Sequence, residues 1–316
     1  MRIVIVGAGS IGLLVGAHLL RGGHEALFVE TRRETVEAIN QQGIGLIGLG
    51  GANPDAVTMI PAKACTDARE IAECDGVILA VKSFDTIAAM QAVAHLITAN
   101  SPVLTLQTGL GNLEAMEKVE RRKNILGGFT YLAGASFGPG RVRLGGIGKT
   151  YLGELDGSAS KRSLRLCQAF NACGLETECV DRIVDRIWWK VIVYSAINAI
   201  SAVLRVKNGR LLDKMESITL AKRMIDEGRE VAAASGIGLD GADLYELFFQ
   251  ACQQTADNAS SMLVDLVSER RTEIDALSGA IVSQGAARGV AACTHMTMVE
   301  LVKLCEKWGP GPHAGH

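Results

Sequence analysis

The chain has 316 residues, of which 48% are apolar and 21% are charged, so it buries a large core and is neither disordered nor collagen-like. Its 32 basic and 34 acidic residues give a net charge of −2, and aromatic residues make up only 4%, which argues against a protein that binds nucleic acid or an acidic membrane surface. A chain of this length more often folds as two domains than as one.

The first half of the sequence alternates short β-branched runs with helical patterns. This alternation predicts strands at residues 3–6, 25–30, 76–81 and 103–107, and helices at residues 11–21, 35–42 and 86–96. Such an order is typical of a mostly parallel sheet covered by helices. Between residues 127 and 157 glycines become frequent and the alternation becomes short, which predicts antiparallel strands that complete the sheet.

The second half has no strand pattern after about residue 180. Helical periodicity predicts helices at residues 187–206, 218–235, 244–267, 273–289 and 297–307. We therefore predict an α/β, Rossmann-like dinucleotide-binding domain over residues 1–180 and an all-α domain over residues 181–316.

The cysteines, histidines and apolar runs limit the kinds of site and location. Eight scattered cysteines form no CxxC pair, which is typical of free thiols in a reducing compartment. The six histidines show no ligand spacing such as HExxH, and His313 and His316 lie in the C-terminal tail. Polar residues such as Lys190 and Ser195 interrupt the longest apolar stretch, which argues against a membrane span. We expect a cytoplasmic protein without a metal site.

A GxGxxG motif joins the first predicted strand to the first predicted helix. It consists of Gly7, Ala8, Gly9, Ser10, Ile11 and Gly12. In this context the first glycine permits a tight turn, the second lets the backbone approach a pyrophosphate, and the third allows the helix to pack closely on the strand. The helix N-terminus then offers N–H groups to the phosphates. We predict a dinucleotide site here, with a turn that serves packing alone as the alternative.

Acidic and basic residues follow the second predicted strand. Glu30 lies eighteen positions after Gly12, where a carboxylate accepts hydrogen bonds from the adenosine ribose and favours NAD. Arg32 and Arg33 follow directly and are able to clamp the 2′-phosphate of NADP. The choice between NAD and NADP stays open, although Glu30 favours NAD, and ordinary surface charges are the alternative for all three residues.

Several blocks in order along the chain resemble the ketopantoate reductase family (2-dehydropantoate 2-reductases), within the larger group that is similar to 6-phosphogluconate dehydrogenase. The blocks are the glycine motif, Val81-Lys82, residues 106–111, Trp189-Lys190 with Asn198 and Asn208-Gly209, and Ser260-Ser261-Met262 with residues 271–275. The resemblance implies a Rossmann-like domain followed by a helical substrate domain, a nicotinamide cofactor that is usually NADP in the family, and a step of pantothenate biosynthesis.

Lys190 also has a physical interpretation of its own. It lies in an apolar run, where an unpaired ammonium would be costly to bury. On a helix, Lys190, Tyr194 and Asn198 share one face, so this polar stripe faces a cleft or a matched partner. Partial desolvation lowers a lysine pKa toward neutrality, as a proton donor to a carbonyl requires. The alternative is that Lys190 extends from a core helix to solvent.

The resemblance implies roles for further residues. It makes Lys190 the proton donor and assigns Glu273 to the active site, where it would hold the substrate hydroxyl and orient the lysine. It also implies that Asn198, Asn208 and Ser261 hydrogen-bond the substrate. Lys82 would meet the cofactor or the substrate carboxylate, or else be a surface lysine. Residues 272–275 by themselves predict a capped helix start with acidic residues in its first turn.

Two positions depart from the family pattern, which usually has asparagine at both. They are Thr108, in the loop expected near the nicotinamide and substrate, and Tyr194, four residues after Lys190. A threonine hydroxyl lacks the separate donor and acceptor arms of an amide, and tyrosine adds bulk. The substrate pocket is therefore altered, while the cofactor turn and Lys190 are retained.

The predicted function is NAD(P)H-dependent reduction of a small 2-oxo acid, by default 2-dehydropantoate. The alternative within this class is a related dehydrogenase that acts on a different hydroxy or oxo acid, which Thr108 and Tyr194 favour. A dinucleotide-sensing regulatory protein is the alternative from another class, and a pure sensor would have no need of Lys190. A homodimer is possible, and the apolar helices alone do not decide it.

Overall fold

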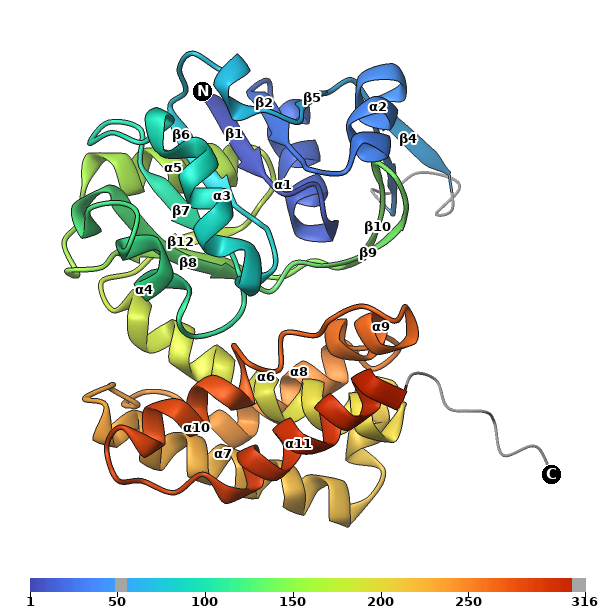
Figure 1. Cartoon of the computed structure of the whole chain (residues 1–316), viewed down its shortest axis with the longest axis vertical. Coiled ribbons are helices and arrows are strands. Elements are labelled where there is room, and N and C mark those ends of the chain that lie inside the picture. The colour runs from blue at the N-terminus through green and yellow to red at the C-terminus, as the bar shows by residue number, and fades with distance from the viewer. Residues whose placement is uncertain (49–55, 309–316) are drawn as a thin grey trace. The chain divides into compact units, whose positions relative to one another are not determined.

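The computed structural model of the chain describes residues 1–48 and 56–308, so the tail histidines His313 and His316 lie outside the described residues. By its internal contacts the chain divides into two compact units (Figure 1). The first contains Met1–Gln107 and Asn112–Ile183, and the second contains Thr108–Gly111 and the chain from Val184 onward. The tetrapeptide Thr108–Gly111 is thus part of the second unit although both of its chain neighbours belong to the first.

The first unit is built on an eight-stranded sheet in the order β12-β11-β8-β7-β6-β1-β2-β5. All neighbouring strands are parallel except β8 and β11, which are antiparallel. In chain order the strands are β1 Arg2–Val6, β2 Glu25–Val29, β5 Lys63–Cys65, β6 Gly76–Leu79, β7 Val103–Thr105, β8 Ile125–Thr130, β11 Thr150–Glu154 and β12 Thr177–Cys179.

Helices cover both faces of this sheet. They are α1 Ser10–Arg21, α2 Arg33–Gln42, α3 Thr86–Val93, α4 Asn112–Glu117 and α5 Lys161–Ala172, with short 3₁₀ turns at Ala68–Glu70, Ser83–Asp85, Ala94–Leu96 and Arg122–Asn124. Because side chains alternate along a strand, Ile3 and Ile5 of β1 enter one apolar cluster with α1 and α5, while Val4 and Val6 enter another with α3. This two-faced burial is typical of parallel α/β sheets and confirms the predicted fold class.

A second sheet of four strands corrects one prediction. Its order is β4-β3-β10-β9, with β3 Ile44–Ile47, β4 Val57–Ile60, β9 Ala133–Gly138 and β10 Arg141–Gly146. Of the antiparallel strands predicted to complete the main sheet, β8 and β11 do so, whereas β9 and β10 join β3 and β4 instead. The pairing of β10 with β3 links segments almost a hundred residues apart, and local alternation of residue types does not reveal which partner a strand chooses.

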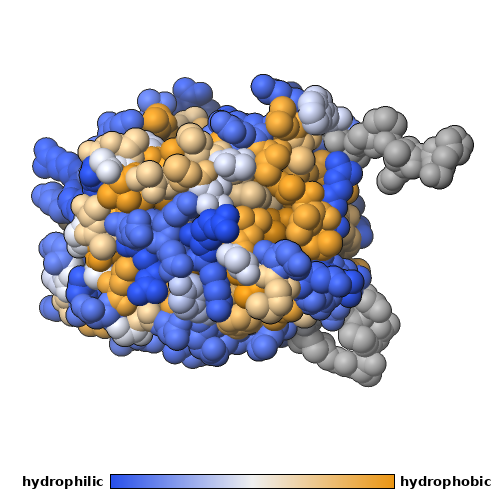
Figure 2. Space-filling model, turned by 90° about the horizontal axis from the view of Figure 1, so that it is seen from below, coloured by the Kyte–Doolittle hydropathy of each residue, from blue (hydrophilic) through white to orange (hydrophobic). Residues whose placement is uncertain are grey.

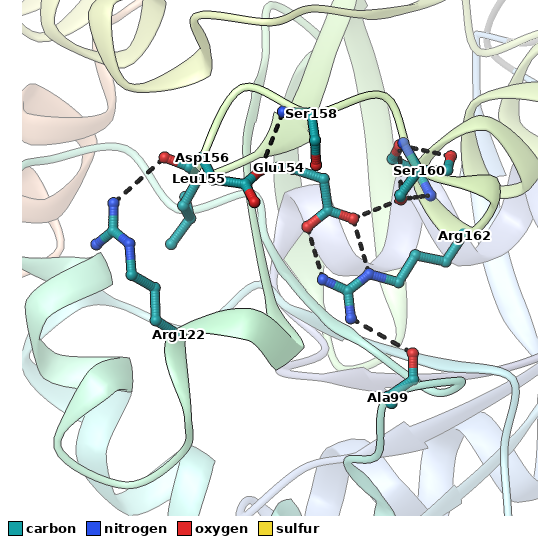
Figure 3. A network of polar contacts seen from close by, with 9 residues as sticks. Ala99, Arg122, Glu154, Leu155, Asp156, Ser158, Ser160 and Arg162 are labelled. Carbon is teal, nitrogen blue, oxygen red and sulfur yellow. Dashed lines mark hydrogen bonds and ion pairs between the residues drawn. The ribbon is translucent and has the colours of Figure 1, made fainter.

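A partly buried ion pair fastens α5 to the main sheet (Figure 3). Glu154 of β11 receives two hydrogen bonds from Arg162, from Nε at 2.7 Å and from a terminal nitrogen at 2.6 Å. The hydroxyl of Ser160, the N-cap of α5, donates to the same carboxylate, and Arg162 also donates to the carbonyl oxygen of Ala99. This network fixes the start of α5 against the end of β11 and against the loop after α3.

In the described residues beyond Cys179, all regular elements are helical. They are α6 Ile183–Leu204, the 3₁₀ turn Asn208–Leu212, α7 Met215–Ala234, α8 Leu244–Gln254, α9 Ser261–Val267, α10 Ser278–Ala286 and α11 Cys293–Trp308. By length and composition α6 is able to cross a membrane, but 83% of its most apolar window is buried within the protein, as in the core helix of a soluble protein. Apolar and hydrophilic side chains are intermixed on the face seen in Figure 2.

Two predicted helices are corrected. The helix predicted over residues 244–267 is two helices, because the chain leaves helical geometry after Gln254 and restarts at Ser261, where the Ser260 hydroxyl accepts the N–H of Leu263. The helix predicted to begin at Glu273 begins at Ser278, and residues 273–277 form a tight turn before it. In both cases the apolar residues keep helical spacing across a segment in which the backbone is not helical, so the pattern alone does not reveal the break.

Candidate active site

The glycine turn lies between β1 and α1. Gly7 has a φ of +100°, and a Cβ there would lie 2.9 Å from the carbonyl oxygen of Ala80. A Cβ on Gly12 would lie 2.0 Å from the carbonyl oxygen of Gly7, so these two glycines make the turn possible. Gly9 differs, because a Cβ on it would meet nothing within 4 Å. The space beside Gly9 is therefore open at the N-terminus of α1, where a turn of this kind holds a pyrophosphate group.

Glu30 follows β2 and is only 7% exposed. Its carboxylate accepts the backbone N–H of Ala8 at 2.9 Å, which links it directly to the glycine turn. It also accepts hydrogen bonds from Arg32, through the backbone N–H at 3.0 Å, through Nε at 3.1 Å and through a terminal nitrogen at 3.1 Å. Burial opposes the charge of Glu30, but the hydrogen bonds from Arg32 and Ala8 outweigh it and hold the pKa of Glu30 below its ordinary value.

Lys82 follows β6, which pairs in parallel with β1. The carboxyl ends of parallel neighbours lie at the same edge of a sheet, so the half-buried Lys82 and the glycine turn lie at one edge of the first unit, together with Glu30 after β2. The first unit therefore gathers at this edge all the candidate cofactor residues except Thr108.

Lys190 lies in the middle of α6 and is 5% exposed, so the alternative that it extends to solvent is wrong. Its Nζ donates a hydrogen bond to Thr108 Oγ1 at 3.1 Å and lies 5.3 Å from the centre of the Tyr194 ring. Burial lowers the pKa of Lys190 from 10.5 to about 8, and the nearby charge of Glu273 limits the decrease. Burial also raises the pKa of Tyr194 to about 12, so its phenol stays protonated at neutral pH.

Asn198 lies one turn beyond Tyr194 and is 4% exposed. Its Nδ2 donates to the carbonyl oxygen of Tyr194 at 2.8 Å, and its Oδ1 accepts the hydroxyl of Ser261 at 3.1 Å. The structure therefore brings these two predicted substrate residues together, with Ser261 at the start of α9. Asn208 does not join this pair. Its Nδ2 donates to Thr255 Oγ1 at 2.9 Å, and its buried Oδ1 has no hydrogen-bond partner among the described residues.

Glu273 lies in the turn before α10 and not in the first turn of a helix. The backbone N–H of Thr272 donates to Glu306 of α11 at 2.7 Å, which anchors the start of this turn. The backbone N–H of Leu110 donates to the carbonyl oxygen of Ala276 at 2.8 Å, which anchors its end. Dipole complementation by Glu273 at a helix start is therefore wrong, and the turn places its charge close enough to Lys190 to affect the lysine pKa.

Sequence reasoning did not single out the side chains that hold the tetrapeptide Thr108–Gly111 at its ends. Gln107 and Asn112 are 6% and 4% exposed, and both form hydrogen bonds with the hydroxyl of Thr86. The sequence signal that could have identified them is one amide residue on each side of a four-residue stretch that contains two glycines.

Comparisons with known proteins agree along the whole chain. The sequence model described as "Ketopantoate reductase PanE/ApbA" matches residues 3–157, and "Ketopantoate reductase PanE/ApbA C terminal" matches residues 182–306. The 2-dehydropantoate 2-reductase of Archaeoglobus fulgidus is 34% identical over 305 residues, covering 96% of this chain and 98% of that protein. That of Pyrococcus horikoshii is 34% identical over 313 residues, covering 98% and 99%.

Solved structures of similar fold include two kinds of enzyme. A D-mandelate dehydrogenase with NADH and anilino(oxo)acetate matches with a TM-score of 0.90 at 27% identity, over 97% of this chain and 99% of that one. A PanE/ApbA family ketopantoate reductase from Ralstonia eutropha matches with a TM-score of 0.86 at 28% identity, over the same shares of the two chains.

Proposed function

The chain belongs to the ketopantoate reductase family of NAD(P)-dependent oxidoreductases, and we propose that it reduces the 2-oxo group of 2-dehydropantoate, with Lys190 as the proton donor. One observation carries the proposal: a lysine that is 5% exposed, hydrogen-bonded to Thr108 and close to the charge of Glu273, has a pKa of about 8. A buried ammonium that titrates near neutrality is suited to protonate a carbonyl oxygen.

The residues of the first unit fit a nicotinamide cofactor, as the open space at Gly9 indicates. The glycine turn would hold the pyrophosphate on the N-terminus of α1, and Lys82 would contact the cofactor or the substrate carboxylate. When bound, the reduced cofactor supplies the hydride that adds to the carbonyl carbon of the substrate.

The residues of the second unit supply the proton and the orientation. Lys190 gives one proton to the carbonyl oxygen as the carbon gains its new hydrogen, so the product is a 2-hydroxy acid. Thr108 holds one N–H of the ammonium, and Glu273 holds the substrate hydroxyl and keeps the lysine charged. Asn198 and Ser261 would bind the polar groups of the substrate, as would Asn208 after turning from Thr255.

A panel of 2-oxo acids tests this function. We expect purified protein to oxidise reduced nicotinamide cofactor with 2-dehydropantoate at least about tenfold more efficiently than with other 2-oxo acids, which corresponds to roughly 1.4 kcal/mol of transition-state discrimination. The measurement is the loss of absorbance of the reduced cofactor. A protein that binds cofactor and turns over none of the acids would be the dinucleotide sensor instead.

A second candidate function is the reduction of an aryl-substituted 2-oxo acid. It is favoured by the Tyr194 ring beside Lys190, at a position where the family usually has asparagine, and by the similarity to a D-mandelate dehydrogenase. Phenylglyoxylate in the same panel separates the two: turnover of this acid without turnover of 2-dehydropantoate selects the second candidate.

A homodimer and a cytoplasmic location remain predictions.

We also propose that NADH is preferred to NADPH, with Glu30 on the adenosine ribose hydroxyls. The carboxylate lies against the glycine turn through Ala8 and is held charged by Arg32, so it would repel a 2′-phosphate. We expect Glu30→Gln to reduce the ratio of kcat/KM for NADH over NADPH by roughly tenfold, about 1.4 kcal/mol. Arg32→Met is the matched control and should leave NADH dominant. A parent enzyme that prefers NADPH would refute the role of Glu30.

A further inference from the structure

A buried polar network borders the tetrapeptide Thr108–Gly111. Gln107 precedes the tetrapeptide and Asn112 follows it, and both hydrogen-bond to Thr86, the first residue of α3, which is 1% exposed. Gln107 Nε2 donates to Thr86 Oγ1 at 2.8 Å, and Thr86 Oγ1 shares its proton between Asn112 Oδ1 at 3.1 Å and the carbonyl oxygen of Ser83 at 2.8 Å. One hydroxyl therefore joins the two ends of the tetrapeptide.

Both polar atoms of the Gln107 amide are hydrogen-bonded. Besides its bond to Thr86, Nε2 donates to the carbonyl oxygen of Val81 at 3.0 Å, and Oε1 accepts the hydroxyl of Thr105 at 3.1 Å. Leaving a buried polar group without its partner costs roughly 1–3 kcal/mol, so this side chain has one favourable arrangement. Because Val81 directly precedes Lys82, the same network also fixes the start of the loop after β6.

Two of the four residues of the tetrapeptide are glycines with positive φ. Gly109 and Gly111 have φ values of +130° and +87°, and a Cβ on Gly111 would meet nothing within 4 Å. Glycine tolerates many backbone conformations, so the way the ends of this segment are held contributes to its path.

Within the second unit the tetrapeptide contacts Lys190 and the turn that carries Glu273. Thr108 Oγ1 accepts the ammonium of Lys190, and the N–H of Leu110 donates to Ala276 in the turn that carries Glu273. A shift of the tetrapeptide would therefore move a hydrogen-bond partner of Lys190 and an anchor of the Glu273 turn together.

We propose that Gln107 is a positioning residue for the reaction: with Thr86 and Asn112 it clamps the ends of Thr108–Gly111, so that the Thr108 hydroxyl stays on the Lys190 ammonium. This inference rests on the proposed function. Gln107 acts through Thr108. A misplacement of about 1 Å at a group that aligns reacting partners costs roughly 100-fold in rate, and the same shift takes a bond of 3.1 Å out of hydrogen-bond range.

The first test compares two changes at Thr86. Thr86→Val keeps the size of the side chain and removes the hydroxyl, and we expect kcat to fall roughly 10- to 100-fold with a much smaller change in the NADH dissociation constant. Thr86→Ser keeps the hydroxyl and should retain near-parental kcat. Gln107→Met should reproduce the effect of Thr86→Val. Parental kcat in both Thr86→Val and Gln107→Met would overturn the proposal.

The second test is a double-mutant cycle with Thr108→Val, which removes the hydroxyl that Lys190 contacts. If Gln107 acts through Thr108, the double variant Thr108→Val/Gln107→Met should lose little more kcat than Thr108→Val alone. A merely structural role predicts losses that add, and additive losses would contradict the proposal. Urea unfolding of each variant shows that the folded protein is being compared.

A third measurement does not need turnover and separates this inference from the proposed function. We expect acetic anhydride to acetylate Lys190 roughly three- to tenfold faster in Gln107→Met than in the parent, because the hydrogen bond from Lys190 to Thr108 would be lost. This ratio corresponds to one ordinary hydrogen bond of about 1 kcal/mol. Peptide mass spectrometry follows the modification. If the parent reduces no 2-oxo acid, the proposed function fails while this rate still decides whether the clamp holds. Equal rates in the two proteins would refute the clamp.

Discussion

The Lys190→Met variant is expected to lose turnover and to become more stable at pH 7. Methionine fills a similar volume without the ammonium, so the proton donor is gone while the packing of α6 is kept. Removal of a general acid lowers kcat by roughly 10²- to 10⁴-fold. The NADH dissociation constant should stay close to the parent value, because the glycine turn and Glu30 are untouched. Steady-state kinetics and a fluorescence titration with NADH measure the two quantities.

The expected gain in stability follows from the pKa of Lys190. The folded-state value of about 8 lies below the ordinary 10.5, so at pH 7 the folded protein holds a buried charge that the unfolded chain holds in water. The difference corresponds to roughly 3 kcal/mol of destabilisation below pH 8, a net value that already includes the attraction to Glu273. Between pH 8 and 10.5 the unfolded state binds more protons, so the penalty decreases as pH rises.

Urea unfolding at pH 7 and at pH 9.5 tests this sign. Lys190→Met should exceed the parent in free energy of unfolding by roughly 1–3 kcal/mol at pH 7 and by less at pH 9.5. The exposed Lys118→Met is the control and should change neither stability nor kcat. The parent kcat for reduction should be level below pH 8 and fall above it, as Lys190 loses its proton. A variant that reduces substrate at the parental rate would exclude Lys190 as the proton donor.

The Gly9→Val variant is expected to fold normally and to lose nucleotide binding. Gly9 has φ −77° and ψ −173°, which any residue adopts, and a Cβ there meets nothing within 4 Å. The added methyl groups would occupy the space beside the α1 N-terminus that the pyrophosphate needs. We expect the NADH dissociation constant to rise about 100-fold, or roughly 2.7 kcal/mol, with an unchanged Tm. Calorimetric titration and thermal unfolding measure these effects.

Gly12→Ala is the matched comparison, because it adds only one methyl group yet should prevent normal folding. Its Cβ would lie 2.0 Å from the carbonyl oxygen of Gly7, and this clash is with backbone, which no side-chain rotation relieves. The free energy of unfolding should fall by several kcal/mol, in the range known for overpacking and backbone strain. Parental NADH affinity in Gly9→Val would show that the cofactor does not use this turn.

Local patterns in the sequence were sufficient for the α/β fold class and for the position of the glycine turn between β1 and α1. Both depend on neighbours in the chain: a strand needs β-branched residues in a row, and the turn needs glycines at fixed spacing. The second sheet was not predictable in this way, because β3 and β10 find each other across almost a hundred residues. Nor was the break between α8 and α9, where the apolar spacing continues while the backbone does not.

The candidate site divides in the same manner. Helical spacing alone placed Lys190, Tyr194 and Asn198 on one face of α6, since residues four apart on a helix are neighbours. Only the tertiary structure decided that Lys190 is buried, that Thr108 and the charge of Glu273 lie close to it, and that Gln107 and Asn112 meet at Thr86. The physical reason is that desolvation and hydrogen bonding act over a few ångströms in space. Chain folding sets these distances, and it does so between residues that lie far apart in the sequence. Thr108 and Glu273, for example, are separated by 165 positions.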